Sequence, residues 1–296
     1  MRTALVFITI FVSALFFGAL FAYPAYMGIN TFHEMSFHKV ISRTTVLSGL
    51  FFSLAYVRIY GLFNLQALGL VAGTHSKRKL FILGFASGVV ILTMLDSILL
   101  SLGIYVIDPD VAMTVSYLAT ILLKSIITGI LVATIEETIF RGALFAGLRN
   151  QANAAIAIFV TSFMYAAVHF IKYRALPDGT DIGWFTGIEI FPAALFRFSN
   201  PITIDSFITL FILGCLFAAV RVRSRSLLAC IGLHAGIVAS LKFFNYLTNY
   251  AGGSPFDYLV NKIDHQFGYL ASTILLLALF VFYLYSRTDE TDRGKA

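Results

Sequence analysis

The sequence is dominated by eight apolar stretches, each close to the length of a helix that crosses a membrane. They lie at residues 4–23, 44–63, 80–104, 111–134, 152–171, 203–220, 227–247 and 267–285. A transmembrane α-helix needs about 20 predominantly apolar residues to cover the hydrocarbon core of a bilayer. The sequence therefore predicts an all-α fold, a polytopic membrane helical bundle of about eight transmembrane helices.

The composition excludes the main alternatives to a membrane protein. Hydrophobic residues make up 59% of the chain, charged residues make up 12%, and the mean hydropathy is +0.87. A soluble chain cannot bury that much apolar surface, and a disordered chain has the opposite composition. Cys215 and Cys230 lie inside apolar runs and are interpreted as small hydrophobic residues, which excludes a disulfide scaffold. The basic residues are scattered in short clusters, which argues against nucleic acid and favours membrane lipid as a partner.

Basic residues in the connections predict how the chain crosses the membrane. One side holds twelve of them, namely Arg2, Lys77, Arg78, Lys79, Arg141, Arg149, Arg221, Arg223, Arg225, Arg287, Arg293 and Lys295. The other side holds six, namely Lys39, Arg43, Lys172, Arg174, Arg197 and Lys262. Lys and Arg concentrate in cytoplasmic connections, so both termini are expected in the cytoplasm, with the bacterial inner membrane as the location if the source is prokaryotic. The first stretch is interpreted as a retained anchor because its apolar run is too long for a signal core.

Four ionisable residues within the apolar stretches are interpreted as structural. Arg58 and Lys242 lie near segment ends, where a long side chain can reach the headgroups. Asp96 and Lys124 fall on neighbouring segments and are expected to form a buried ion pair across them. A role in water access is the alternative for this pair, because a charge at bilayer depth costs at least a few kcal/mol.

Two adjacent glutamates and an arginine carry more information. Glu137 and Arg141 are four residues apart, so on a helix they share a face and can form an ion pair. Glu136 points about 100° away from Glu137 and roughly 140° away from Arg141 on a helix of 3.6 residues per turn. Glu136 is therefore expected to stay free for chemistry. The alternative is that both glutamates cap the end of the fourth stretch near the headgroups.

Two histidines are candidate partners of Glu136. The polar turn at residues 150–153 predicts a helical hairpin whose midpoint is equally far from Glu136 and from His169. At 1.5 Å per residue both lie about 25 Å from the turn, so they are expected at the same level on antiparallel helices. His234 has Gly232 and Gly236 beside it, which are small enough to let another helix approach closely. Alone, His234 is as consistent with packing as with function.

In this order, these elements resemble the CAAX prenyl endopeptidase and bacteriocin-processing (CPBP, or Abi) family of intramembrane proteases. The first family motif is two glutamates, three further residues and an arginine, and it matches Glu136 to Arg141 in full. The second is an aromatic residue separated by three residues from a histidine. It matches Tyr165 and His169, with Tyr where Phe is usual.

The third family motif is only half present. It consists of a histidine with an asparagine or similar polar residue four positions later, and here His234 is followed by Val238. The resemblance covers residues 125–244, and it divides the chain into N-terminal transmembrane helices (1–110), a protease-like core (111–247), and a last helix with a polar tail (248–296). Val238 favours the alternative function, a non-catalytic membrane scaffold or bacteriocin-immunity protein of the same fold.

The resemblance implies an intramembrane endopeptidase that hydrolyses a membrane-proximal peptide bond of a membrane-associated protein or peptide. It implies that Glu136 and His169 activate a water molecule and that His234 assists the oxyanion, in a cavity open to one side. The residues that would support this site are Glu137, Arg141 and Tyr165.

Whether a metal takes part is open from the sequence. One glutamate and two histidines would suffice as three zinc ligands with an open fourth position. Water activation by Glu136 and His169 can also be written without a metal. The segment from His33 to His38 is not interpreted as a zinc motif, because its histidines are five residues apart and it is expected to be a loop.

Overall fold

The computed structural model describes residues 2–59, 76–177, 179–195, 204–263 and 265–293, and these are almost wholly helical. The helices are α1 (Arg2–Leu20), α2 (Ala22–Asn30), α3 (Phe37–Ile59), α4 (Lys77–Ser101), α5 (Val115–Glu137), α6 (Phe145–Arg149), α7 (Ala154–Val168), α8 (Thr186–Leu195), α9 (Ile204–Ser224), α10 (Leu227–Leu247) and α11 (Tyr269–Arg293). A π-helix, η1 (Thr138–Leu144), joins α5 to α6, and a 3-10 helix, η4 (Asp257–Leu259), precedes α11. Two short strands, β1 (Tyr105–Ile107) and β2 (Thr248–Tyr250), pair antiparallel. The predicted all-α class is confirmed.

Among the described residues, six helices are long and apolar enough to cross a membrane, and α1 with α2 makes a seventh if this pair, bent by 45°, is one span. The longest candidate is the continuous run of α5, η1 and α6, which has 35 residues. Helix α7 has 15 residues, so the stretch expected at 152–171 forms a helix shorter than a full span. The stretch at 44–63 continues past α3 into residues outside the described part. The chain is an integral, multi-pass membrane protein.

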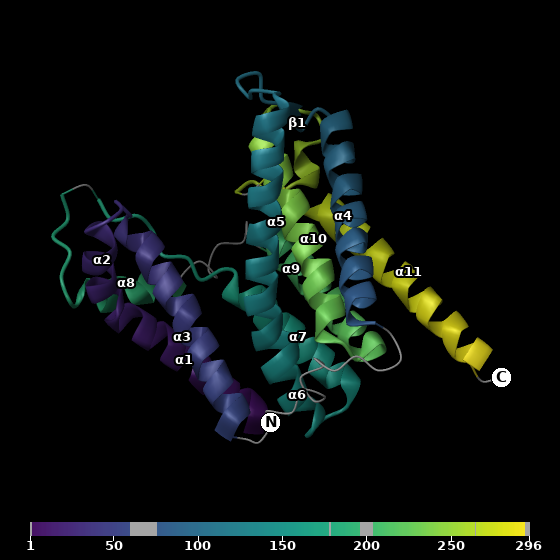
Figure 1. Ribbon diagram of the computed structural model, residues 1–296, viewed down its shortest axis with the longest axis horizontal. Coiled ribbons are helices and arrows are strands. Elements are labelled where there is room, and N and C mark those ends of the chain that lie inside the picture. The colour runs from purple at the N-terminus through teal and green to yellow at the C-terminus, as the bar shows by residue number, and fades with distance from the viewer. Residues whose placement is uncertain (1, 60–75, 178, 196–203, 264, 294–296) are drawn as a thin grey trace.

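The centre of the bundle is formed by α10, which packs against α4 and α5 (Figure 1). Gly232 and Gly236 of α10 contact the α4 backbone, where a Cβ atom would collide with the carbonyl oxygens of Phe81 and Phe85. Small residues let helix backbones approach closely in a membrane. Of the six candidate spans, α10 is the most enclosed, with 67% of its apolar window buried. His234 is therefore carried into the interior.

Helices α1, α2, α3 and α8 form an arm beside this bundle (Figure 1). Helix α1 packs along α3, and α8 packs against α1. The arm has its own small hydrophobic cluster, which consists of Ala19, Ala22, Phe37, Ile41, Tyr173 and Ala194. Helix α3 also contacts η1, so the arm forms a wall next to the segment that carries the adjacent glutamates.

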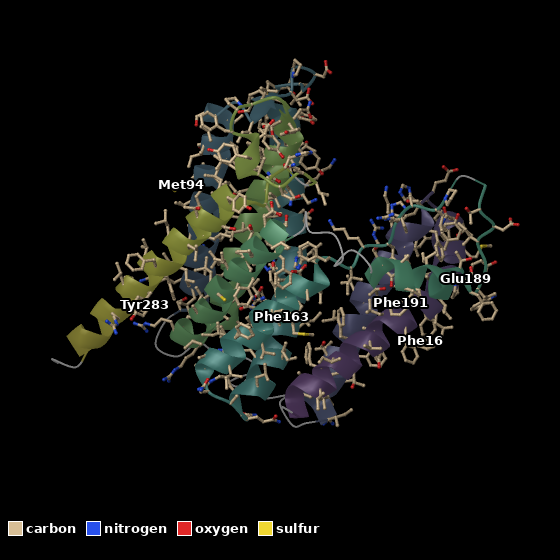
Figure 2. All side chains as sticks on the ribbon, turned by 180° about the vertical axis from the view of Figure 1, so that it is seen from behind. Phe16, Met94, Phe163, Glu189, Phe191 and Tyr283 are labelled. Atoms are coloured by element: carbon tan, nitrogen blue, oxygen red, sulfur yellow. The ribbon has the colours of Figure 1, made fainter. Side chains whose placement is uncertain are left out.

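Apolar side chains cover much of the outer surface. Phe16, Met94, Phe163 and Tyr283 come from four different helices, and each exposes between 46% and 51% of its surface. Figure 2 shows them spread over the arm and the bundle. This distribution is what contact with lipid requires, since soluble proteins rarely expose large contiguous apolar patches.

The expected ion pair between Asp96 and Lys124 is not formed. Asp96 is buried on the packed face of α4, and its Oδ1 atom has no hydrogen-bond partner among the described residues. Lys124 is exposed, because the packed face of α5 consists of Ile121, Ser125, Gly129, Ala133 and Glu137. The two helices follow one another in the sequence, but these two side chains do not face each other.

We expect Gly88→Ala to destabilise the protein. A Cβ at Gly88 of α4 would collide with the carbonyl oxygen of Leu233 in α10, and neither backbone can move without opening the interface. Overpacking of this kind costs about 1–3 kcal/mol, so the unfolding temperature in detergent should fall by several degrees. The matched control is Gly28→Ala in α2, where nothing lies within 4 Å of the added atom. Equal unfolding temperatures for both variants would contradict the packing described.

Candidate functional site

The adjacent glutamates lie at the end of α5, where the chain changes from an α-helix to the π-helix η1. Glu137 is fully buried, whereas 27% of the Glu136 side chain is exposed. The two carboxylates therefore diverge as the helical spacing predicts. Turns of π-helix are rare and often occur at functional sites, and the sequence analysis did not anticipate this one.

Glu137 and Arg141 form the expected ion pair, with 3.1 Å between Arg141 Nη1 and Glu137 Oε1. Both side chains are 0% exposed. Arg141 Nη2 also donates to the carbonyl oxygen of Gly214 at 3.0 Å. The guanidinium carbon lies 4.6 Å from the ring centroid of Tyr165 and 5.0 Å from that of Phe217. These contacts compensate for burying the charge, since cation–π attraction adds to the ion pair and the hydrogen bonds.

His234 lies between the two glutamates. Its Nδ1 atom is 2.9 Å from Glu137 Oε1, and its Nε2 atom is 3.9 Å from Glu136 Oε2. The ring stacks on Phe217 with 4.7 Å between centroids and is 3% exposed. The sequence analysis assigned Glu137 to Arg141 alone and missed this second partner. Because an ionised carboxylate only accepts, Nδ1 of His234 carries a hydrogen and donates it to Glu137.

His169 also lies close to Glu136. It caps the carboxyl end of α7, and its Nδ1 atom is 2.7 Å from the carbonyl oxygen of Tyr165. A carbonyl can only accept, so Nδ1 carries a hydrogen, and in the neutral ring Nε2 has the lone pair. That Nε2 atom lies 3.8 Å from Glu136 Oε2. This short distance agrees with the prediction that Glu136 and His169 lie at the same depth on antiparallel helices.

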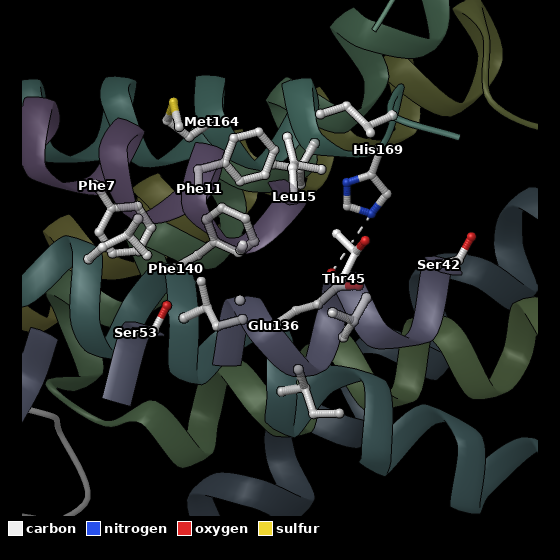
Figure 3. A pocket seen from close by; sticks show the side chains of 18 of the residues that line it. Phe7, Phe11, Leu15, Ser42, Thr45, Ser53, Glu136, Phe140, Met164 and His169 are labelled. Carbon is white, nitrogen blue, oxygen red and sulfur yellow. Dashed lines mark ion pairs between the residues drawn. The ribbon is translucent and has the colours of Figure 1, made fainter. Parts of the chain in front are cut away.

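A cavity of about 230 Å³ opens beside Glu136 and His169 (Figure 3). One wall comes from α1 and α3 of the arm, and the other comes from α5, η1 and α7. The lining is mostly apolar and includes Phe7, Phe11, Leu15, Phe140 and Met164. Its polar residues are Ser42, Thr45, Ser53, Glu136, His169 and Tyr173.

The sequence analysis did not anticipate the wall from the arm. The sequence feature that could have indicated this wall is a stripe of small or polar residues on α3. These residues line the cavity and recur every three or four positions, namely Ser42, Thr45, Gly49 and Ser53. That spacing places them on one face of the helix. A stripe of this kind inside an apolar segment indicates a face turned away from lipid.

The geometry around Glu136 fits the binding of a water molecule. Its Oε2 atom has no hydrogen-bond partner among the described residues. The separations of 3.8 Å to His169 and 3.9 Å to His234 are too long for direct hydrogen bonds. They are short enough for one water to bridge the groups at about 2.8 Å from each. The described residues contain no group of three or more His, Cys, Asp or Glu arranged to hold a metal ion.

The comparisons with known proteins agree with the motifs. Residues 118–240 match the family model described as type II CAAX prenyl endopeptidase, Rce1-like. This segment is somewhat less than half of the chain, and it contains Glu136, His169 and His234. No curated protein and no solved structure matches the chain. The resemblance to a CAAX protease family is confirmed, and the match supports a membrane protease in general terms.

Replacing Arg141 tests the buried cluster. We expect Arg141→Ala to lower the yield of folded protein and its unfolding temperature, because Glu137 would lose its cation in a fully buried position. Breaking a buried ion pair by removing one partner costs about 3–5 kcal/mol. The matched control is Arg149→Ala at the exposed end of α6. An Arg141→Ala protein that unfolds at the wild-type temperature would show that the pair does not stabilise the site.

Proposed function

We propose that this protein is an intramembrane endopeptidase that hydrolyses a membrane-proximal peptide bond. Glu136 and His169 activate the attacking water, and His234 assists the oxyanion. The proposal rests above all on Glu136 Oε2, which lies within 3.9 Å of the Nε2 atoms of both histidines. Glu136 and His169 line the cavity, whereas His234 is buried behind its lining residues. The match of the surrounding segment to a CAAX endopeptidase family supports the same reaction.

Glu136 is the general base in this mechanism. A water molecule held between Glu136 Oε2 and His169 Nε2 gives a proton to the carboxylate as its oxygen attacks the carbonyl carbon of the substrate. The carbon–nitrogen bond then breaks, and the proton passes from Glu136 to the leaving amine. The hydrogen bond from His169 to the Tyr165 carbonyl keeps Nε2 directed at the water.

The charges around His234 favour one further proton in the cluster, and the proposed mechanism places this proton on His234. Glu136 and Glu137 carry two negative charges and Arg141 carries one positive charge, so the cluster is electroneutral when it holds one further proton. A neutral cluster is favoured inside a membrane because uncompensated charge there is costly. With that proton on His234, Nδ1 donates to Glu137 and Nε2 can donate to a developing oxyanion.

The substrate is proposed to be a membrane-associated protein or peptide. The cavity is lined mainly by apolar side chains and lies between helices that themselves face lipid. A prenylated CAAX peptide is the first substrate to test, because the matching family is described as a CAAX prenyl endopeptidase.

A non-catalytic scaffold or immunity protein is the second candidate function. The observation that favours it is Val238, which cannot donate the hydrogen bond that the resembling family supplies from this position. The two functions differ in whether Glu136 is needed for cleavage. A scaffold needs the buried pair of Glu137 and Arg141 for folding but gives Glu136 no chemical task.

We expect Glu136→Gln to abolish proteolysis and to leave the protein folded. The amide keeps the shape of the side chain but cannot take a proton, and loss of a general base lowers turnover by about 10²- to 10⁴-fold. The measurement is cleavage of an internally quenched, prenylated CAAX peptide by the protein in liposomes, with thermal unfolding measured in parallel.

The control for this experiment is Glu189→Gln on α8, a glutamate outside the cavity lining. That variant should cleave at the wild-type rate. Full activity of Glu136→Gln would show that another group is the base. Absence of cleavage by the folded wild-type protein would favour the scaffold.

A further inference from the structure

We infer that the hydroxyl groups of Thr45 and Tyr173 supply the oxyanion donor that position 238 lacks. This role presupposes the proteolytic function proposed above. The two hydroxyl oxygens lie 3.5 Å apart, and both residues line the cavity that contains Glu136 and His169. Figure 3 shows Thr45, Glu136 and His169 among the side chains that line this cavity.

Val238 is not placed to complete the site. It lies one turn beyond His234 on α10 and is half-buried, but it is not among the residues that line the cavity. A second donor for the oxyanion, in addition to His234, must therefore come from another element. The arm is the element that closes the cavity on the side opposite to α5 and α7.

Thr45 is held in place by the contact between α1 and α3. Gly18 of α1 approaches so closely that an added Cβ would lie 2.5 Å from the Cα atom of Thr45. The neighbouring Thr44 donates to the carbonyl oxygen of Gly18 at 2.7 Å. These contacts fix the helix backbone at Thr45, so its hydroxyl is preorganised, as a donor to a transition state must be.

Tyr173 reaches the same place from the segment that follows α7. It lies four residues after His169, and its ring packs in the arm cluster with Ala19, Phe37 and Ile41. Burial raises the pKa of Tyr173 above its ordinary value, an effect larger than the opposing one of its hydrogen bond with Thr45. The phenol therefore keeps its hydrogen at neutral pH and is able to donate it.

The pair of hydroxyl groups has one hydrogen that its own hydrogen bond does not use. Thr45 and Tyr173 together carry two hydroxyl hydrogens, and the bond between them uses one. The second is available to a ligand in the cavity. Ser42 differs, because its hydroxyl donates to the carbonyl oxygen of His38. Ser53 lies at the far end of the cavity from His169 in Figure 3.

Two hydroxyl variants test this role. Thr45→Val and Tyr173→Phe remove one hydroxyl each while keeping the shape of the side chain. We expect the double variant, which removes both hydroxyl hydrogens, to lower kcat for the quenched, prenylated CAAX peptide by about a hundredfold or more, the effect of losing an oxyanion donor. KM should change little, because the hydrogen bond strengthens in the transition state. Each single variant leaves one hydroxyl hydrogen in the cavity, so each should be slowed less than the double variant.

Three further variants separate this role from packing. Thr45→Ser keeps the hydroxyl and should keep the wild-type kcat. Ser87→Ala removes an exposed hydroxyl of α4 outside the cavity lining and should also keep it. Val238→Asn should not restore the lost kcat in the Thr45→Val/Tyr173→Phe protein, because position 238 does not line the cavity. In the wild-type protein it should have little effect, because the donor is already present.

The outcomes distinguish this inference from the function on which it rests. If Glu136→Gln is inactive while the Thr45→Val/Tyr173→Phe double variant keeps the wild-type kcat, the inference is overturned and the proteolytic function stands. If Thr45→Ser is as slow as Thr45→Val, the methyl group matters through packing and the inference is again overturned. If the folded wild-type protein does not cleave the peptide, the proposed function is overturned, and this role with it.

Discussion

The buried carboxylate of Glu137 is the interaction on which the rest of the site depends. It accepts from Arg141 of η1 and from His234 of α10, so one side chain joins two elements that are far apart in the sequence. Arg141 extends the network to the backbone of α9 through the carbonyl oxygen of Gly214. Because an unpaired charge inside a membrane is costly, these partners hold one another in a single arrangement. That arrangement leaves Glu136 with an unsatisfied oxygen directed at two histidines.

Local periodicity was enough to predict much of the fold and part of the site. The stretch predicted at 227–247 coincides with α10, and the divergence of Glu136 from Glu137 follows from helical spacing alone. The depth of His169 followed from counting the residues on either side of the turn at 150–153. Each of these inferences uses contacts within one helix or one hairpin, where geometry depends on distance along the sequence.

Inferences about contacts between separate helices succeeded less often. Asp96 and Lys124 were expected to face each other, yet one is buried and the other is exposed, because sequence order does not fix the rotation of a helix about its axis. For the same reason the bond between His234 and Glu137 was missed. The π-helix η1 also has no signal in the hydrophobic pattern, since it changes the hydrogen bonding of the backbone and not the order of apolar residues.

The two walls of the cavity come from different parts of the chain. Glu136 and His169 lie within the segment that matches the endopeptidase family, whereas Phe7, Phe11 and Thr45 lie before it. Changes in the arm can therefore alter the shape of the cavity without touching the buried ion pairs that hold the glutamates. Helix α3 contacts η1 directly, so the arm adjoins the segment that follows the two glutamates. In the proposed mechanism, a substrate whose carbonyl oxygen is poorly positioned by the arm loses the hydrogen bond from Thr45 in the transition state. Such a substrate would be cleaved more slowly, so the arm would contribute to substrate selectivity.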